Sequence, residues 1–179
     1  HDVPAFVPYL GERPWRPHTG RTGSLRVGLC HAGNPAYRFD ARRSVAVTDL
    51  APLAQVEGVE FISLRPGDAD AGSLPFIRHE LAADADLLDT ARLMATLDLV
   101  ISVDTLVAHL AGAVGCPVWL FSRYGGDWRW AAAFDAPSEC AGTGGEEAGG
   151  LPTGAAASQW YPTLRQFRQA RLLPPAQAW

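Results

Sequence analysis

Two adjacent polar residues, Asp104 and Thr105, separate an apolar stretch from a helical one. The unbroken apolar run at 99–103 is typical of a buried parallel strand, and residues 105–114 predict a helix. The first N–H groups of a helix lack partners within it and carry partial positive charge, so this turn can hold a phosphate. Thr105 adds a hydroxyl donor, and His109 lies about one turn further along the same helix face.

A structural role would explain the same residues. Asp104 would then be the N-cap of the helix, and His109 a helix histidine whose ring nitrogens are satisfied by neighbouring groups. The residue types alone leave both interpretations open.

A second polar stretch, residues 31–44, also follows a short apolar run. Gly33 and Asn34 allow unusual backbone conformations there. All 15 basic residues of the chain are arginines, so arginine must supply any side-chain cation other than histidine. The stretch holds donors of the kind that a diphosphate needs, namely Arg38, Arg42, Arg43 and Ser44. For any single arginine, a solvated basic loop is the alternative.

Strands and helices alternate around these stretches. In chain order the predicted elements are a strand at 27–30, a helix that Thr48 and Asp49 cap and Gly58 ends, a strand at 59–64, a short strand at 76–79, a helix after Asp86, the strand at 99–103, the helix at 105–114, a strand at 117–121 and a final helix around Leu164 and Phe167. This order predicts an α/β fold, a Rossmann-like open parallel sheet with helices on both faces. Ligands bind beyond the carboxyl ends of the strands in such sheets, where both polar stretches lie.

The composition excludes several classes of protein. With 179 residues, 47% hydrophobic residues and 19% charged residues, the chain is long and apolar enough for one globular domain. A net charge of −4 argues against a nucleic-acid partner. There is no 18-residue apolar run for a membrane span, and three cysteines without paired spacing indicate reduced thiols and a cytoplasmic location.

Proline and glycine divide the chain. Residues 1–24 predict an extended linker or docking arm, and residues 25–179 a folded domain. Within that domain, residues 136–158 are rich in glycine and alanine and predict a mobile insert. Because the chain begins with His1, we expect a piece of a longer protein.

Several catalytic motifs are absent. The sequence contains neither the dinucleotide motif G-x-G-x-x-G nor the Walker motif G-x-x-x-x-G-K-S/T, which weakens an assignment to NAD or ATP chemistry. The hydrolase motif G-x-S-x-G is absent as well.

Five stretches within residues 26–170 carry a family resemblance. They are Ala32-Gly33-Asn34-Pro35 with Asp40 and Arg43-Ser44, Leu97 through Asp104-Thr105 to His109-Leu110-Ala111-Gly112, Pro117-Val118-Trp119, Asp127-Trp128-Arg129-Trp130, and Trp160-Tyr161-Pro162-Thr163 with Arg165, Phe167 and Arg168. With them the chain resembles the C-terminal, donor-binding half of a GT-B glycosyltransferase of the heptosyltransferase-like kind, glycosyltransferase family 9. It is most similar to bacterial enzymes that join a tetratricopeptide region to a glycosyltransferase domain. His31, Tyr37 and Phe39 stand where the family usually has Trp, His and Asn.

The resemblance implies the donor-binding domain of an inverting, metal-independent hexosyl- or heptosyltransferase. Its substrate would be a nucleotide-diphosphate sugar, with no cofactor and no metal, and the sugar would pass to a protein or glycan acceptor. An N-terminal acceptor domain, outside this chain, would supply the catalytic base, and a tetratricopeptide region is a further expected partner. The donor would contact Gly33, Asn34, Arg38, Arg43, Ser44, Asp104, Thr105 and His109.

Two other functions remain open. A nucleotide-sugar epimerase of the same two-domain architecture would need carboxylates that reach the sugar from both halves. A non-catalytic module would keep the fold for nucleotide or protein binding, because a fold alone does not fix a function.

Overall fold

The computed structural model describes residues 10, 23–67, 74–127, 129–130, 156–158 and 160–169. The predicted linker at 1–24 falls outside this part of the chain except for residues 10, 23 and 24. The predicted insert at 136–158 falls outside it except for its last three residues.

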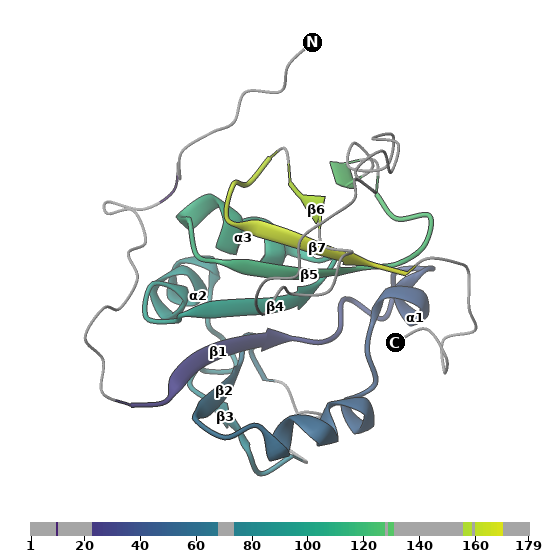
Figure 1. Ribbon diagram of the computed structural model, residues 1–179. Helices are drawn as coiled ribbons and strands as arrows, with labels where there is room; N and C mark the ends of the chain where they lie inside the picture. Colours follow the sequence, from purple (N-terminus) through teal and green to yellow (C-terminus); the bar gives the residue numbers. More distant parts are fainter. Residues whose placement is uncertain are drawn as a thin grey trace, which may run out of the picture.

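One sheet organises the described residues. Its strands follow the order β3-β2-β1-β4-β5-β7-β6 (Figure 1). Six of them run parallel, and β6 pairs antiparallel with β7. The strands are β1 Leu25–Cys30, β2 Val59–Ser63, β3 Ile77–His79, β4 Leu99–Val103, β5 Val118–Ser122, β6 Ala156–Ala157 and β7 Leu164–Arg168. The predicted α/β class with an open parallel sheet is confirmed.

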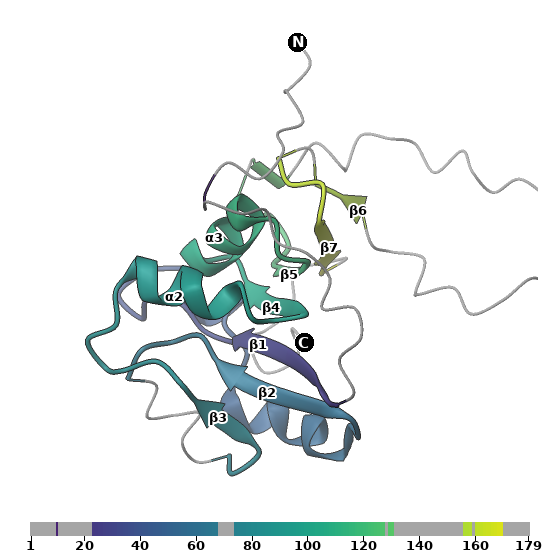
Figure 2. The ribbon, with the colours of Figure 1, turned by 90° about the vertical axis from the view of Figure 1, so that its left-hand side faces the viewer.

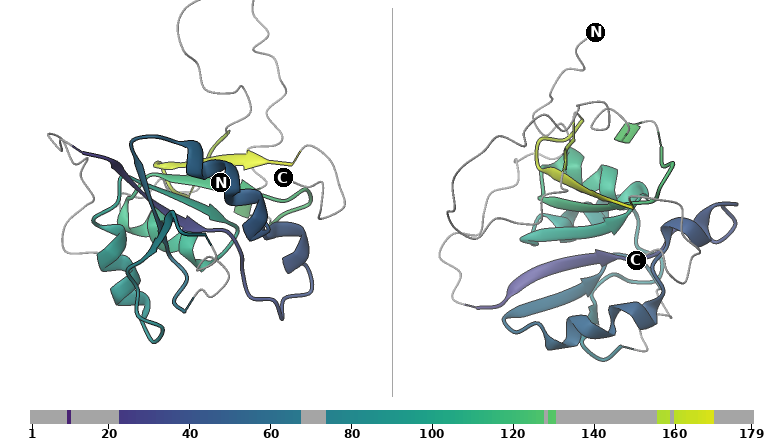
Figure 3. Two further views of the ribbon diagram at one scale, coloured as in Figure 1. Left: turned by 90° about the horizontal axis from the view of Figure 1, so that it is seen from below. Right: turned by 45° about the vertical axis from the view of Figure 1, so that its right-hand side comes forward.

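Helices cover both faces of this sheet. On one face lie α2 (Leu87–Met94) and α3 (Leu106–Val114), and on the other lies the 3-10 helix η1 (Val47–Gln55) (Figures 2 and 3). A short helix, α1 (Asp40–Arg43), lies near the arrowheads of the central strands (Figure 3). The strand pleat sends alternate residues into two hydrophobic clusters, so that Cys30 packs with α2 and α3 while Leu29 packs on the face of η1.

Two predicted helix features differ from the structure. The helix near residue 50 begins at Val47 and no side chain caps it, so Thr48 and Asp49 do not mark its start. It is a 3-10 helix throughout and includes Pro52, which has no N–H to donate to an α-helical ladder.

The predicted final helix around Leu164 and Phe167 is wrong, because these residues lie on strand β7. Leu164 is fully buried against the α2 and α3 side, while Phe167 packs edge-on against Trp119 and Phe121 of β5. The spacing of three that predicted a helix joins residues on opposite faces of a strand. Pairing with the otherwise open edge of β5 decides the conformation.

The order of the strands places a switch point at the centre of the sheet. From β1 the chain continues outward to β2 and β3, and from β4 it continues in the other direction to β5. Because β1 and β4 are neighbours, the segments that leave their carboxyl ends diverge above the same place. In open α/β sheets this is where ligands bind. Cys30 and Val103 end the two strands there.

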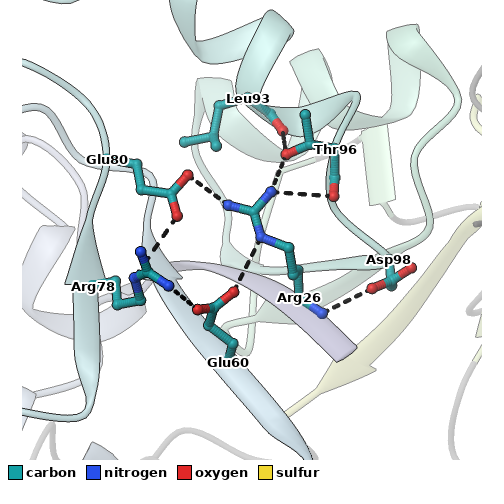
Figure 4. Close-up of polar contacts among 7 residues, drawn as sticks. All are labelled: Arg26, Glu60, Arg78, Glu80, Leu93, Thr96 and Asp98. Atoms are coloured by element: carbon teal, nitrogen blue, oxygen red, sulfur yellow. Dashed lines mark hydrogen bonds and ion pairs between the residues drawn. The ribbon is translucent and has the colours of Figure 1, made fainter. Parts of the chain in front are cut away.

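Charges are paired around Arg26, the second residue of β1. The Arg26 guanidinium on β1 binds Glu60 on β2 at 3.2 Å and Glu80 beyond β3 at 2.5 Å, and Arg78 pairs with Glu60 (Figure 4). The Arg26 backbone N–H donates to the Asp98 carboxylate at 2.8 Å, just before β4. Arg78, then Arg26, lowers the pKa of Glu60 despite some desolvation. This network ties Arg26 and Glu60, near the amino ends of β1 and β2, to β3 and to the residue before β4.

None of the helices in the described part of the chain is both long and apolar enough to span a membrane.

The position of Leu164 gives a test of the β7 assignment. We expect Leu164→Ala to lower the free energy of unfolding by roughly 2–5 kcal/mol, because it empties a fully buried position beneath α3. Leu87→Ala is the control, because Leu87 is 55% exposed and its truncation leaves no cavity. Urea unfolding monitored by circular dichroism measures both. Equal effects of the two substitutions would contradict this packing.

Candidate active site at the switch point

The turn between β4 and α3 leaves the first helical N–H groups without a side-chain cap. Thr105 is the N-cap residue, in extended conformation, yet its hydroxyl makes no capping hydrogen bond. Instead Thr105 Oγ1 lies 3.2 Å from Ser102 Oγ and 3.5 Å from Cys30 Sγ. Ser102 Oγ donates to the Val103 carbonyl at 2.7 Å, so the Thr105 hydroxyl can donate to Ser102. The N-terminus of α3 therefore keeps the donors that an anion requires.

Asp104 does not cap α3. Its Oδ1 accepts a hydrogen bond from Trp130 Nε1 at 3.0 Å, and its backbone carbonyl accepts one from Arg43 NH1 at 2.6 Å. The structural alternative in which Asp104 is the N-cap is wrong, because the N-cap is Thr105. Two segments distant in sequence hold Asp104 in place.

A buried carboxylate organises the loop after β1. Asp40 is 9% exposed and accepts hydrogen bonds from Arg43 Nε at 2.8 Å and from Ser44 Oγ at 2.9 Å. Ser44 Oγ in turn accepts the Gly33 N–H at 3.0 Å. A Cβ at Gly33 would collide with the Arg43 guanidinium and the Asp40 carboxylate, so only glycine fits this approach. Gly33, Asp40, Arg43 and Ser44 thus form one clamp.

His31 closes the same loop at its base. The Arg65 guanidinium, 3.1 Å from His31 Nε2, can only donate, so Nε2 accepts. His31 Nδ1 therefore carries the hydrogen and donates to the Val45 carbonyl at 2.9 Å. The Val45 N–H returns a bond to the His31 carbonyl at 2.7 Å. These bonds fix both ends of the loop.

Two predicted site residues lie outside the clamp. Asn34 Oδ1 accepts the Ala36 N–H at 2.9 Å and shapes a local turn. Arg38 is exposed, and its guanidinium lies 4.3 Å from the centre of the Phe39 ring.

His109 reaches the site through an aromatic neighbour. Its ring stacks on Trp130 with centroids 5.0 Å apart, and its Nδ1 lies 3.1 Å from the Tyr161 hydroxyl. Trp130 then donates to Asp104, so His109 braces the turn indirectly. Desolvation lowers the pKa of His109 although the Asp104 charge opposes this, so the imidazole is neutral at neutral pH.

The residues that complete these contacts were not among the predicted site residues. Trp130 and Tyr161 belong to stretches that carry the family resemblance, and this was the available signal for them. Asp40 and Ser102 also belong to those stretches, whereas Cys30 gave no such signal, because its contact with Thr105 depends on a strand and a turn that meet only in the fold.

Neither described cysteine is an evident nucleophile. Cys30 and Cys116 are buried, and desolvation, then the Asp98 charge, raises the pKa of Cys116 to about 12. Cys30 Sγ donates to the Ala32 carbonyl at 3.6 Å. In the described residues no three His, Cys, Asp or Glu side chains gather as metal ligands.

Part of this region matches a known family. The model of glycosyltransferase family 9 (heptosyltransferase) matches residues 68–122, a short region that includes β4, the Asp104-Thr105 turn, α3 and β5. Over these residues the chain is similar to glycosyltransferase family 9. It does not extend over the clamp.

A curated relative gives a second, partial match. Protein FlbA of Caulobacter vibrioides (strain ATCC 19089 / CIP 103742 / CB 15) is 35% identical over an alignment of 81 residues, and the match covers 40% of this chain. The match spans 13% of the length of FlbA. No solved structure matches the chain significantly.

The burial of His109 predicts a pH dependence of stability. Its pKa is lowered in the folded protein, so the unfolded chain binds a proton first as the pH falls through about 6.5. Stability contributed by the neutral ring is therefore present above that pH and is lost as the pH falls to the folded pKa. We expect His109→Gln to lose less stability than wild type between pH 7.5 and 5.5 in urea unfolding.

The exposed His79 provides the control for this experiment. His79→Gln should retain the wild-type dependence on pH. If His109→Gln also retains it, the imidazole is not held neutral by its surroundings.

Proposed function

We propose that this chain is the donor-binding domain of an inverting, metal-independent GT-B glycosyltransferase that holds a nucleotide-diphosphate sugar at the switch point. One observation carries the proposal. Arg43 joins the glycine loop after β1 to the Asp104 carbonyl before α3, so a cation and an uncapped helix N-terminus share one place. This combination suits a diphosphate.

The expected chemistry is electrostatic. When the sugar leaves the diphosphate, negative charge grows on the phosphate oxygens, and fixed donors aimed at that charge lower the barrier. Arg43 uses Nε and NH1 for the clamp, while NH2 has no hydrogen-bond partner in the described part of the chain. NH2 and the first N–H groups of α3 would bind the leaving group, and the Thr105 hydroxyl would add a further donor by turning its hydrogen away from Ser102.

Asp104 would orient the sugar. Trp130 engages its Oδ1, which fixes the carboxylate and leaves Oδ2 to accept a sugar hydroxyl. His109 and Tyr161 support Trp130 from behind, so they act as positioning residues.

The rest of the enzyme is also part of the proposal. The catalytic base would come from an N-terminal acceptor domain, and a tetratricopeptide region would present a protein or glycan acceptor. A hexose or heptose donor and a cytoplasmic, bacterial setting fit this assignment.

Calorimetric titration with UDP, GDP and ADP tests the proposal. We expect at least one nucleoside diphosphate to bind with modest affinity, equally well with and without a chelator, because the helix end and Arg43 replace a metal ion. If a folded sample gives no heat with any of the three, the non-catalytic binding module becomes the better assignment.

Arg43 should contribute strongly to this binding. We expect Arg43→Ala to weaken the binding of the nucleoside diphosphate by about ten- to a hundredfold, or roughly 1.5–3 kcal/mol, because the variant loses a charge-assisted hydrogen bond. Because the substitution also leaves the buried Asp40 carboxylate without its partner, urea unfolding must confirm that the variant is folded. Arg92→Ala, on the exposed side of α2, is the matched control and should bind as wild type does.

Thr105→Val tests the same turn without removing a charge. Valine has nearly the shape of threonine but lacks the hydroxyl that lies near Ser102 and Cys30. We expect weaker binding than wild type, by less than tenfold, in the same titration. If the variant binds with the affinity of wild type, the Thr105 hydroxyl takes no part in binding the nucleoside diphosphate.

A further inference from the structure

Three guanidinium groups surround one aromatic ring near the switch point. Arg38, Arg42 and Arg123 place their guanidinium carbons 4.3, 5.9 and 5.1 Å from the centre of the Phe39 ring. Tyr37 lies edge-on to Phe39 with centroids 5.7 Å apart, and Arg43 lies 4.7 Å from the Tyr37 ring. We call Phe39, Arg38, Arg42 and Arg123 the arginine cluster.

The arginine cluster is positive, and the part of the chain that the structure describes supplies no counter-charge to it. In the described residues no carboxylate forms an ion pair with Arg38, Arg42 or Arg123. Other arginines of the same molecule do have such partners, namely Arg26, Arg43, Arg78, Arg92 and Arg129. Three like charges around one ring repel one another, and the ring face offsets this only in part. A bound anion would relieve the repulsion.

The three arginines come from two segments of the chain, and one of them is already oriented. Arg42 lies on α1 and Arg38 in the loop before it, while Arg123 directly follows β5. Arg123 NH1 donates to the Gly125 carbonyl at 2.8 Å, which fixes the side chain in a turn where Gly125 has φ +62°. Less side-chain entropy is then lost when a ligand binds.

The arginine cluster lies at the same edge of the sheet as Asp104. Strand β5 runs parallel to β4, with Phe121 in register with Val103, so Arg123 and Asp104 both follow the carboxyl ends of neighbouring strands. Arg42 and Arg43 are consecutive residues of α1, and Arg43 binds the Asp104 carbonyl. The arginine cluster therefore adjoins the site proposed above.

We propose that the arginine cluster is an oxyanion subsite that binds a phosphate chain, with Arg42 and Arg123 as ligand-binding residues beside Arg43. That the phosphate chain is the diphosphate of a nucleotide sugar rests on the proposed function. Planar guanidinium groups bind phosphate oxygens through two parallel N–H donors, and three of them match the multiple charge of a diphosphate better than a single carboxylate.

Inorganic pyrophosphate is the probe that separates this subsite from the nucleotide site. We expect the full 179-residue chain to bind pyrophosphate in calorimetry, with an affinity that falls as salt is added. Arg123→Gln and Arg42→Gln should each weaken binding about five- to tenfold, because each removes one charged donor. Phe39→Leu should weaken it about threefold through loss of the shared ring. Arg92→Gln, on α2, is the matched control and should leave the affinity unchanged.

The outcomes distinguish the two proposals. If pyrophosphate affinity is unchanged in Arg123→Gln and Arg42→Gln but falls in Arg43→Ala, the subsite is overturned and the proposed function survives. Arg123→Gln and Arg42→Gln could instead weaken pyrophosphate binding while UDP, GDP and ADP bind wild type no more tightly than pyrophosphate does. In that case the subsite stands and the assignment of a nucleotide ligand is lost. Tighter binding of a hexaglutamate peptide than of pyrophosphate, lost in the same variants, would replace the phosphate ligand by an acidic protein segment. No binding of any probe overturns both proposals.

Discussion

The candidate site depends on the Arg43 guanidinium, which joins two segments that are 61 residues apart in the sequence. Asp40 is a buried carboxylate, and a buried charge is stable only when it is paired and hydrogen-bonded. Arg43 and Ser44 meet that requirement, and Ser44 also binds the Gly33 N–H. The shape of the loop after β1 therefore follows from the pairing of one carboxylate. Because Arg43 also binds the Asp104 carbonyl, the same pairing sets the position of the loop relative to α3.

A second set of contacts supports the turn from the other side. Trp130 donates to the Asp104 carboxylate and stacks on His109, and His109 lies beside the Tyr161 hydroxyl. Gly112 permits this arrangement, because a Cβ there would collide with the Tyr161 ring. A charged imidazole would lose solvation in this setting, and the neutral form needs no counter-ion. Asp104 is thus fixed by an ordered aromatic group on one side and by a cation on the other.

The sequence predicted features that follow from local patterns. The apolar run of β4, the turn at Asp104 and the end of α3 at Val114, where the predicted helix also ends, all follow from neighbouring residue types. Asp86 likewise caps α2, with Asp89 completing the capping box.

Features that depend on long-range contacts were missed. Residues 164–168 have a spacing that fits a helix, but β5 offers an open edge and pairing with it makes them a strand. The partners of Asp104 and His109 come from Trp130 and Tyr161, whose positions are set by tertiary packing. The arrangement of Arg38, Arg42 and Arg123 around Phe39 likewise combines a loop with a strand end, which no local pattern encodes.

Some arginines of this molecule are paired with carboxylates and others are not, and the place of the unpaired ones bears on function. Glu60 and Glu80 neutralise Arg26 and Arg78 (Figure 4). At the carboxyl end, the arginine cluster keeps its charge although the whole chain carries a net charge of −4. A positive edge on an acidic protein cannot follow from composition alone, so it arises from where the carboxylates are placed. Such an edge concentrates anions at the end of the sheet where the first turn of α3 offers its N–H groups.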